Sequence, residues 1–246
     1  MAKKLSRKQQ KQRRALLMSF LAGGTTVALS LLGFVPVLGK MVQRLRPPGA
    51  LAEKQFLASC IKCGQCVQVC PVEAIKLADA ADGFGIGTPY IDARAQACDF
   101  SCDAVQCVLA CPTGSLSHDI DKKEQVRMGL ARLDRPDACL AMKGEGFKGL
   151  ARGGDFPGLH RYTEVDRWTP IRIADHPYDL DLCDLCVREC PIENAIALEP
   201  LSDDPDDKRR IPVVKEPCVG CGMCEMICPV EPTAIVIDER KIWGAA

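Results

Sequence analysis

Sixteen cysteines in regular groups constrain this 246-residue chain more than any other feature of its sequence. The segment CIKCGQCVQVCP, residues 60–71, places four cysteines at positions i, i+3, i+6 and i+10 and follows the last of them with proline. The segment CVGCGMCEMICP, residues 218–229, repeats that spacing. So many cysteines in one short chain are expected to replace much of an ordinary apolar core.

The spacing indicates what the cysteines bind. Tetrahedral zinc sites pair two C-x2-C knuckles across a long loop. A C-x2-C-x2-C-x3-C-P run is instead the pattern of bacterial ferredoxins, in which three closely spaced cysteines wrap one [4Fe–4S] cluster and the fourth ligates the other cluster of a pair. Gly64 and Gly222 suit such a loop, because a residue without Cβ lets the backbone pass close to inorganic sulfur. The sequence therefore favours iron–sulfur clusters over zinc.

Two further cysteine blocks and one isolated cysteine complete a repeat. The segment CDFSCDAVQCVLACP follows the first block by 38 residues, and CDLCVRECP precedes the last block by 35 residues. This arrangement predicts one two-cluster unit that occurs twice. The second block holds Cys98, Cys102, Cys107 and Cys111, the third holds Cys183, Cys186 and Cys190, and Cys139 stands alone.

The crossed pairing of two-cluster ferredoxins assigns every cysteine to one of four [4Fe–4S] clusters. Cys139 supplies the ligand that the third block lacks, so the count closes with none to spare; the alternative is that Cys139 is an ordinary buried thiol. The predicted sets are Cys60, Cys63, Cys66 and Cys111; Cys98, Cys102, Cys107 and Cys70; Cys218, Cys221, Cys224 and Cys190; and Cys139, Cys183, Cys186 and Cys228.

The expected fold is α+β, with tandem two-cluster ferredoxin modules behind an amino-terminal signal-anchor helix. Short helices are expected to carry the ligands, and short strands to follow each Cys-Pro pair, because proline ends a helical turn and the residues beyond it are β-branched. The segments RRIPVV and TAIVID are candidates to pair, and residues 201–209 form an exposed charged loop. The predicted boundaries are 1–46 for the signal or anchor, 47–135 for the first module, and 136–246 for the second module.

The amino-terminal segment resembles an export signal. Arg13 and Arg14 precede 25 residues without charge, Ala15 to Gly39, which is long enough to cross a bilayer at 1.5 Å rise per residue. The paired arginines resemble a twin-arginine signal, and seven basic residues ahead of Ala15 place the amino terminus in the cytoplasm. No A-x-A cleavage site follows, so the segment is predicted to remain as a membrane anchor. The alternative is a buried helix of a soluble domain.

Charge and missing motifs exclude several functions. The first 46 residues hold ten of the 32 Lys and Arg residues and none of the 32 Asp and Glu residues, so the rest of the chain is acidic. An acidic body argues against nucleic acid as a partner. No C-x-x-C-H haem motif, nucleotide-binding loop or catalytic triad is present, so we expect an electron carrier and not an enzyme with its own substrate.

Several segments together make the chain similar to the NapG/MauM-type periplasmic ferredoxins over residues 44–240. They are RLRPPGAL, CIKCGQCVQVCP, GTPYIDAR, CPTGSL, RMGLA and CVGCGMCE. The resemblance implies that the protein binds four [4Fe–4S] clusters and is located at the periplasmic face of the cytoplasmic membrane. It implies electron transfer between a membrane quinol dehydrogenase and a periplasmic terminal oxidoreductase. Two alternatives remain: an assembly factor for a redox enzyme, or a fixed iron–sulfur subunit of a larger respiratory complex.

One departure from that family lies between Cys139 and Cys183. The family has only a few residues here, whereas this chain has an insertion, residues 140–182. Its aromatic residues suit a loop that docks a partner, and a lid that shields a cluster is the equal alternative. His176, within the insertion, is a weaker candidate than Cys139 for the missing ligand.

Overall fold

A computed structural model describes residues 7–38, 43–83, 85–166 and 168–243 of the chain. It divides into two units, one of Met1–Val42 with Asp79–Ile86 and one of Gln43–Ala78 with Gly87–Ala246. The second unit, called the body below, contains both cysteine modules. Within the body, Leu45 is buried and bridges to Ile91. The predicted domain boundaries stay predictions.

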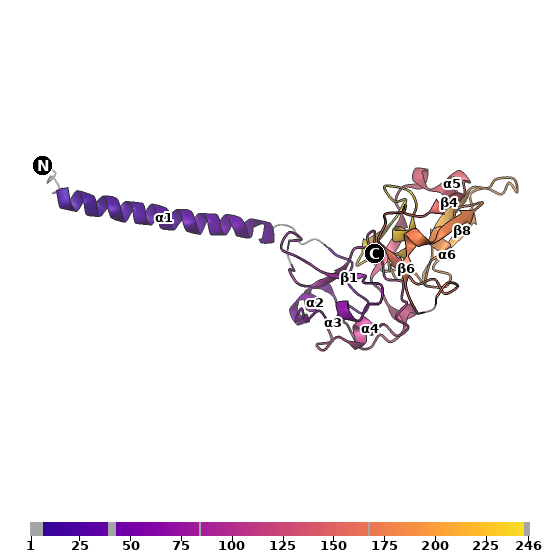
Figure 1. The fold of residues 1–246 in the computed structure, drawn as a ribbon, viewed down its shortest axis with the longest axis horizontal. Coiled ribbons are helices and arrows are strands. Elements are labelled where there is room, and N and C mark those ends of the chain that lie inside the picture. The colour runs from indigo at the N-terminus through magenta and orange to yellow at the C-terminus, as the bar shows by residue number, and fades with distance from the viewer. Residues whose placement is uncertain (1–6, 39–42, 84, 167, 244–246) are drawn as a thin grey trace. The chain divides into compact units, whose positions relative to one another are not determined.

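The first unit contains one long helix, α1, Arg7–Leu38 (Figure 1). Of the helices described, none is both long and apolar enough to cross a membrane. The predicted signal anchor at residues 1–46 stays a prediction. The uncharged stretch includes glycine, serine and threonine among its leucines, and Ser19, Thr26 and Ser30 donate hydrogen bonds to carbonyls three or four residues earlier.

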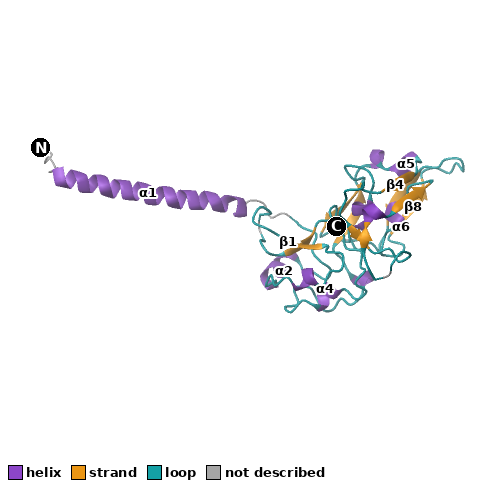
Figure 2. Ribbon diagram, viewed as in Figure 1, coloured by secondary structure: helices purple, strands orange, loops and turns teal. Residues whose placement is uncertain are grey.

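The body alternates short helices with two-stranded sheets (Figures 1 and 2), and so confirms an α+β fold for this part of the chain. Figure 1 shows α2, α3 and α4 toward one end of the body, and α5, α6 and β8 toward the other. The helices are α2 Glu53–Ser59, α3 Gln65–Gln68, α4 Gln106–Leu109, α5 Leu140–Lys143, α6 Leu185–Arg188 and α7 Met223–Ile227, with 3-10 turns η1 Lys123–Gln125, η2 Pro136–Ala138 and η3 Ile173–Asp175. The strands are β1 Ile75–Leu77, β2 Pro89–Ile91, β3 Gly129–Leu133, β4 Phe147–Leu150, β5 Leu159–His160, β6 Ile171–Arg172, β7 Pro177–Leu180, β8 Ile196–Pro200, β9 Arg210–Val214 and β10 Ile235–Glu239.

One local pattern recurs at each cysteine block and matches the sequence prediction. A helix of one turn carries a cysteine in α3, α4, α6 and α7. A Cys-Pro pair follows each helix, and proline, which lacks an amide hydrogen, cannot continue the helical hydrogen bonding. The apolar residues beyond the proline then form strands β1, β8 and β10, while Leu116 after the second block makes an isolated bridge to Ala50.

The strand pairing differs from the prediction in the second module. The RRIPVV segment, β9, pairs antiparallel with β8, and the loop between them, residues 201–209, is mostly exposed as expected. The TAIVID segment, β10, pairs with β3, with Ile237 opposite Ala131. The prediction that TAIVID pairs with RRIPVV is therefore wrong, because β3 lies at the end of the first module and its apolar face needs a cover. This pairing crosses the predicted module boundary at residue 135.

The core combines apolar side chains with the cysteines. Phe56, Met223, Met226 and Ile227 are fully buried. Arg46 is buried beside Phe56, where it forms an ion pair with Glu53 and donates to Thr88 and to the carbonyl of Pro89. A buried guanidinium requires such partners, because an unpaired charge in the interior costs several kcal/mol by order of magnitude.

Candidate iron–sulfur centres

The first thiol set lies at the α2, α3 and α4 end of the body. Cys60 follows α2, Cys66 lies within α3, and Cys111 follows α4. These three cysteines and Cys63 line one cavity. Burial, and then the neighbouring Cys60 and Cys63 thiols, raise the pKa of Cys66 to about 11, with Cys111 also contributing. The structure therefore brings together the four residues of the first predicted set.

The second thiol set combines three cysteines of the second block with Cys70 from the first block. Cys107, within α4, is buried, and burial followed by the nearby Cys102 and Cys70 thiols raises its pKa. Burial followed by Cys107 raises the pKa of Cys98. Cys70 thus approaches the second block, while Cys111 approaches the first, which is the crossed arrangement of the sequence prediction.

The third thiol set is the most enclosed. Cys190, Cys218, Cys221 and Cys224 line one cavity together with apolar residues. Burial, and then Cys221, raise the pKa of Cys224 well above its usual range, with Cys218 and Cys190 also close.

The fourth thiol set includes the isolated cysteine. Cys139, Cys183, Cys186 and Cys228 line another cavity. Burial, followed by the Cys183, Cys139 and Cys228 thiols, raises the pKa of Cys186. The structure thus places Cys139 beside the third block, whereas His176 stacks on Tyr162 with ring centroids 3.9 Å apart.

The insertion between Cys139 and Cys183 folds back on itself, so its length does not separate the two thiols. Strand β4 pairs with β7, and Phe147 lies opposite Leu180. The amide of Cys183 donates to the carbonyl of Glu145 at 3.0 Å. The two ends of the insertion therefore lie close together. Cys139 and Cys183 can belong to one thiol set although 43 residues separate them in the sequence.

The donor chemistry of these sets fits iron–sulfur clusters. In the described ranges, no group of three or more His, Cys, Asp or Glu side chains is arranged to hold a single metal ion. Each set instead offers four thiols, and the three cavities are lined by no Asp, Glu or His. Soft thiolates of this kind select iron–sulfur clusters. A bound cluster would hold as thiolates the groups whose proximity and burial otherwise raise their pKa values.

Comparison with known proteins agrees with this chemistry. The 4Fe-4S dicluster domain matches residues 59–115 and 181–231, which contain all four cysteine blocks but not Cys139. The ferredoxin-type protein NapG of Escherichia coli is 37% identical over 198 residues, covering 79% of this chain and 70% of NapG. The methylamine utilization ferredoxin-type protein MauM of Methylorubrum extorquens is 34% identical over 225 residues, covering 90% of this chain and 85% of MauM.

The chain belongs to the NapG/MauM family of ferredoxin-type proteins. It is an iron–sulfur protein with 4Fe–4S clusters and a role in electron transfer. No solved structure matches the chain.

The four thiol sets of this NapG/MauM-type protein follow one another in a row. Cys66 of the first set is a neighbour of Cys107 in the second. The amide of Cys98 in the second set donates to the carbonyl of Cys221 in the third at 3.1 Å. Cys224 of the third set is a neighbour of Cys186 in the fourth. The junction between the modules is therefore the junction between the second and third sets.

Backbone amides also reach two of the sulfurs. The amide of Ala74 donates to Cys70 Sγ at 3.3 Å, and that of Leu116 donates to Cys111 Sγ at 3.5 Å. Burial alone would raise the pKa of Cys111, but the bonds from Leu116 and Thr113 outweigh it and lower the pKa. Hydrogen bonds to cluster sulfurs are one of the means by which proteins set reduction potentials. Sequence spacing gives no sign of these particular donors.

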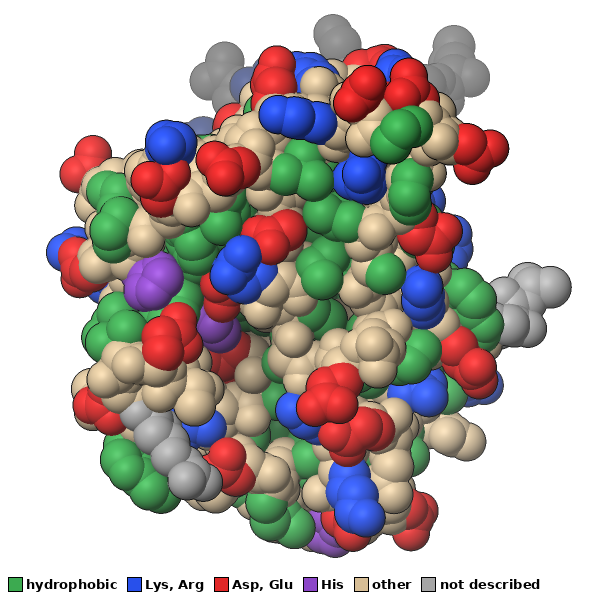
Figure 3. Space-filling view, turned by 90° about the vertical axis from the view of Figure 1, so that its right-hand side faces the viewer, with side chains coloured by type: hydrophobic (Ala, Val, Ile, Leu, Met, Phe, Trp, Pro, Cys, Tyr) green, Lys and Arg blue, Asp and Glu red, His purple; other side chains and the backbone are tan. Residues whose placement is uncertain are grey.

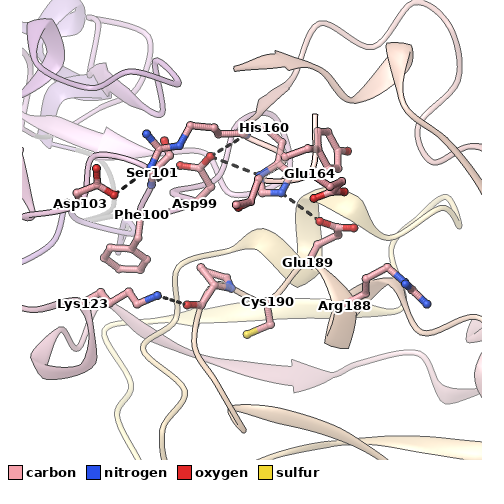
Figure 4. A pocket seen from close by; sticks show the side chains of 14 residues that line it. Asp99, Phe100, Ser101, Asp103, Lys123, His160, Glu164, Arg188, Glu189 and Cys190 are labelled. Carbon is pink, nitrogen blue, oxygen red and sulfur yellow. Dashed lines mark hydrogen bonds and ion pairs between the residues drawn. The ribbon is translucent and has the colours of Figure 1, made fainter. Parts of the chain in front are cut away.

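The insertion contributes a buried charged group beside the module junction, which the sequence analysis missed. His160 Nε2 lies 3.1 Å from Glu189 Oε2, and Nδ1 lies 3.4 Å from Asp99 Oδ2. Figure 4 shows His160 between these two carboxylates. In the sequence, Asp99 follows Cys98 and Glu189 precedes Cys190. Burial would lower the pKa of His160, but the two carboxylates outweigh it and raise the pKa to about 9.

Further contacts fix the insertion against both modules. Gln96 accepts from the amide of Leu159 and donates to its carbonyl, at 2.7 and 2.8 Å. Arg152 donates to the carbonyls of Arg94 and Met226. The predicted roles of the insertion as a docking loop or a lid both remain predictions, but neither accounts for these contacts. They identify it also as a structural bridge across the junction.

Proposed function

We propose that this protein is a four-cluster electron carrier of the periplasm. Its electrons pass between a membrane quinol dehydrogenase and a periplasmic terminal oxidoreductase. The observation that carries the proposal is the row of four thiol sets, each of which gathers four cysteines from distant parts of the chain. A row of clusters suits one-electron transfer along its length, and the family membership supports a redox role.

The first test counts the clusters. Protein prepared without oxygen is expected to contain about sixteen iron atoms and sixteen acid-labile sulfides per chain, since each [4Fe–4S] cluster takes four cysteine ligands. Iron near eight, or zinc in its place, would contradict the four-cluster proposal.

A second test concerns the crossed pairing. The Cys111→Ser variant is expected to alter the cluster of the first set, although Cys111 lies in the second cysteine block. Electron paramagnetic resonance of this variant, compared with Cys63→Ser and Cys102→Ser, assigns the damaged cluster. A spectrum that matches Cys102→Ser and not Cys63→Ser would contradict the crossed pairing.

The amino-terminal segment supports the periplasmic part of the proposal. Arg13 and Arg14 precede an uncharged stretch, as in signals that export folded, cofactor-loaded proteins. Changing both arginines to lysine keeps the charge and is expected to retain the protein in the cytoplasm, as measured by cell fractionation. Unchanged delivery to the periplasm would exclude this route.

The carrier role predicts dependence on a partner. The full chain is expected to accept electrons from dithionite and pass them to a dye, but to oxidise quinol only when the membrane partner is added. The described part of the chain offers four thiol sets, and its sequence carries no motif that indicates quinol chemistry. Steady quinol oxidation by the purified chain alone would make it an enzyme in its own right.

A further inference from the structure

Exposure differs sharply among the sixteen cysteines, all of which lie in the described part of the chain. Cys63 of the first set is exposed, while the others are buried or half-buried. Three of the four cysteines of the third set are buried, and Cys190 is half-buried. Electron transfer weakens steeply with distance, so a protein partner exchanges electrons fastest where a cluster is nearest to the surface. The first set offers that approach.

The first set also stands at one end of the row. Its neighbour is the second set, through Cys66 and Cys107, and the third and fourth sets follow beyond the module junction. An electron that enters at Cys63 can therefore pass along all four thiol sets in order, and one that leaves there can have passed along all of them. The exposed thiol and the end of the row coincide.

Charge distinguishes the rim of the first set from the rest of the body. Lys62 is the one charged residue that lines the cavity of this set, and it is exposed. Beyond residue 46 the chain has 22 Lys and Arg residues against 32 Asp and Glu residues. Figure 3 shows acidic and basic side chains interspersed over the face that it presents. An acidic partner is thus repelled by the body as a whole and attracted at Lys62.

Two exposed side chains, those of Ile61 and Lys62, lie next to Cys63 in the chain. Lys62 has a φ of +58°, a left-handed conformation that costs a residue with Cβ about 1–2 kcal/mol. Ile61, beside it, is 62% exposed and supplies apolar contact area. Interfaces combine such apolar centres with a charged rim.

We propose that the surface formed by Ile61, Lys62 and Cys63 is the docking site for an acidic redox protein, which exchanges electrons with the cluster of the first set. One electron passes between the partner's cofactor and this cluster, so that one is oxidised as the other is reduced. This proposal rests on the proposed carrier function and adds to it the site of exchange and the charge of the partner.

The test uses reduced flavodoxin, an acidic electron-transfer protein, as the donor to the full, cluster-loaded chain. Stopped-flow absorbance at low salt gives the second-order rate of cluster reduction. The Lys62→Glu variant is expected to lower this rate about tenfold, because it reverses the local attraction that steers encounter. Lys62→Gln is expected to have a smaller effect in the same direction. Lys208→Glu, a charge reversal on the exposed loop between β8 and β9, is the matched control and is expected to stay within about twofold.

Reduction by methyl viologen radical, a small cation, separates the two levels of the proposal. If every variant has the native iron content and is fully reduced by the dye, its clusters are intact. Differences in the rate of reduction by flavodoxin then report on the docking site alone. Equal flavodoxin rates for the native chain and Lys62→Glu, or a larger loss in Lys208→Glu, would overturn the docking site and leave the carrier function standing. Clusters that the dye cannot reduce in the native chain would overturn the carrier function itself.

Discussion

The loops that begin the first and last cysteine blocks share one spacing but have opposite surroundings. In the first loop Lys62, between Cys60 and Cys63, is exposed with φ +58°. In the last loop the matching residue is Gly220, with φ +72°, and a Cβ there would lie 2.3 Å from the backbone of Gly129 in β3. One loop is open to solvent, and the other is covered by the end of the first module. The comparison teaches that the repeated motif builds each thiol set, while neighbouring strands decide its access to solvent.

Exchanging the two loop residues should produce the largest effect. Gly220→Lys is expected to destabilise the body by more than about 4 kcal/mol, since the side chain would overlap backbone that cannot move without breaking the β3–β10 pairing. Lys62→Gly, the reverse exchange, is expected to change stability by less than about 1 kcal/mol. Denaturant unfolding with iron content as a second readout measures both. Similar losses in the two variants would contradict the comparison.

The second-largest effect is expected in the reduction potentials of the clusters in the first and third thiol sets. A reduced cluster carries additional negative charge, which burial disfavours, so the third set is expected to have a lower potential than the first by on the order of 100 mV. Redox titration followed by electron paramagnetic resonance gives the order, with Cys63→Ser and Cys218→Ser identifying the two signals. If the cluster altered by Cys218→Ser is reduced first, burial does not control the potentials here.

The module junction should make stability depend on pH. The folded-state pKa of His160 is raised to about 9 from its ordinary value of 6.5, so the stability that it contributes is complete below about pH 6.5 and is lost as pH rises through 9. We expect the free energy of unfolding to fall by roughly 3 kcal/mol over that interval. His160→Gln should flatten this fall, and His118→Gln, at an exposed site, should not. A pH profile unchanged by His160→Gln would exclude the linkage.

The smallest effect is expected at the open rim. Ile61→Gln removes an exposed apolar side chain and should alter the free energy of unfolding by less than about 0.5 kcal/mol. In contrast, Val219→Ala, at the buried position that matches it in the last loop, should cost about 1–3 kcal/mol through lost packing. Chemical denaturation of both variants checks the pair. A large loss for Ile61→Gln would show that the rim is packed in the folded protein.

Sequence alone determined the local chemistry of this protein. Cysteine spacing predicted the short ligand-bearing helices, the strands after three of the four Cys-Pro pairs, and groups of thiols that the structure brings together, including Cys139 with Cys183. These features depend on residues a few positions apart, or on a pairing rule that follows from the motif. The ligand assignments themselves remain predictions for the tests above.

Only the tertiary structure decided what depends on long-range packing. The pairing of β10 with β3, the placement of His160 between Asp99 and Glu189, and the return of the insertion through β4 and β7 join residues tens of positions apart. A motif fixes nearby backbone geometry, but burial and strand partners follow from which apolar surfaces the whole chain brings together, and no local pattern contains that information.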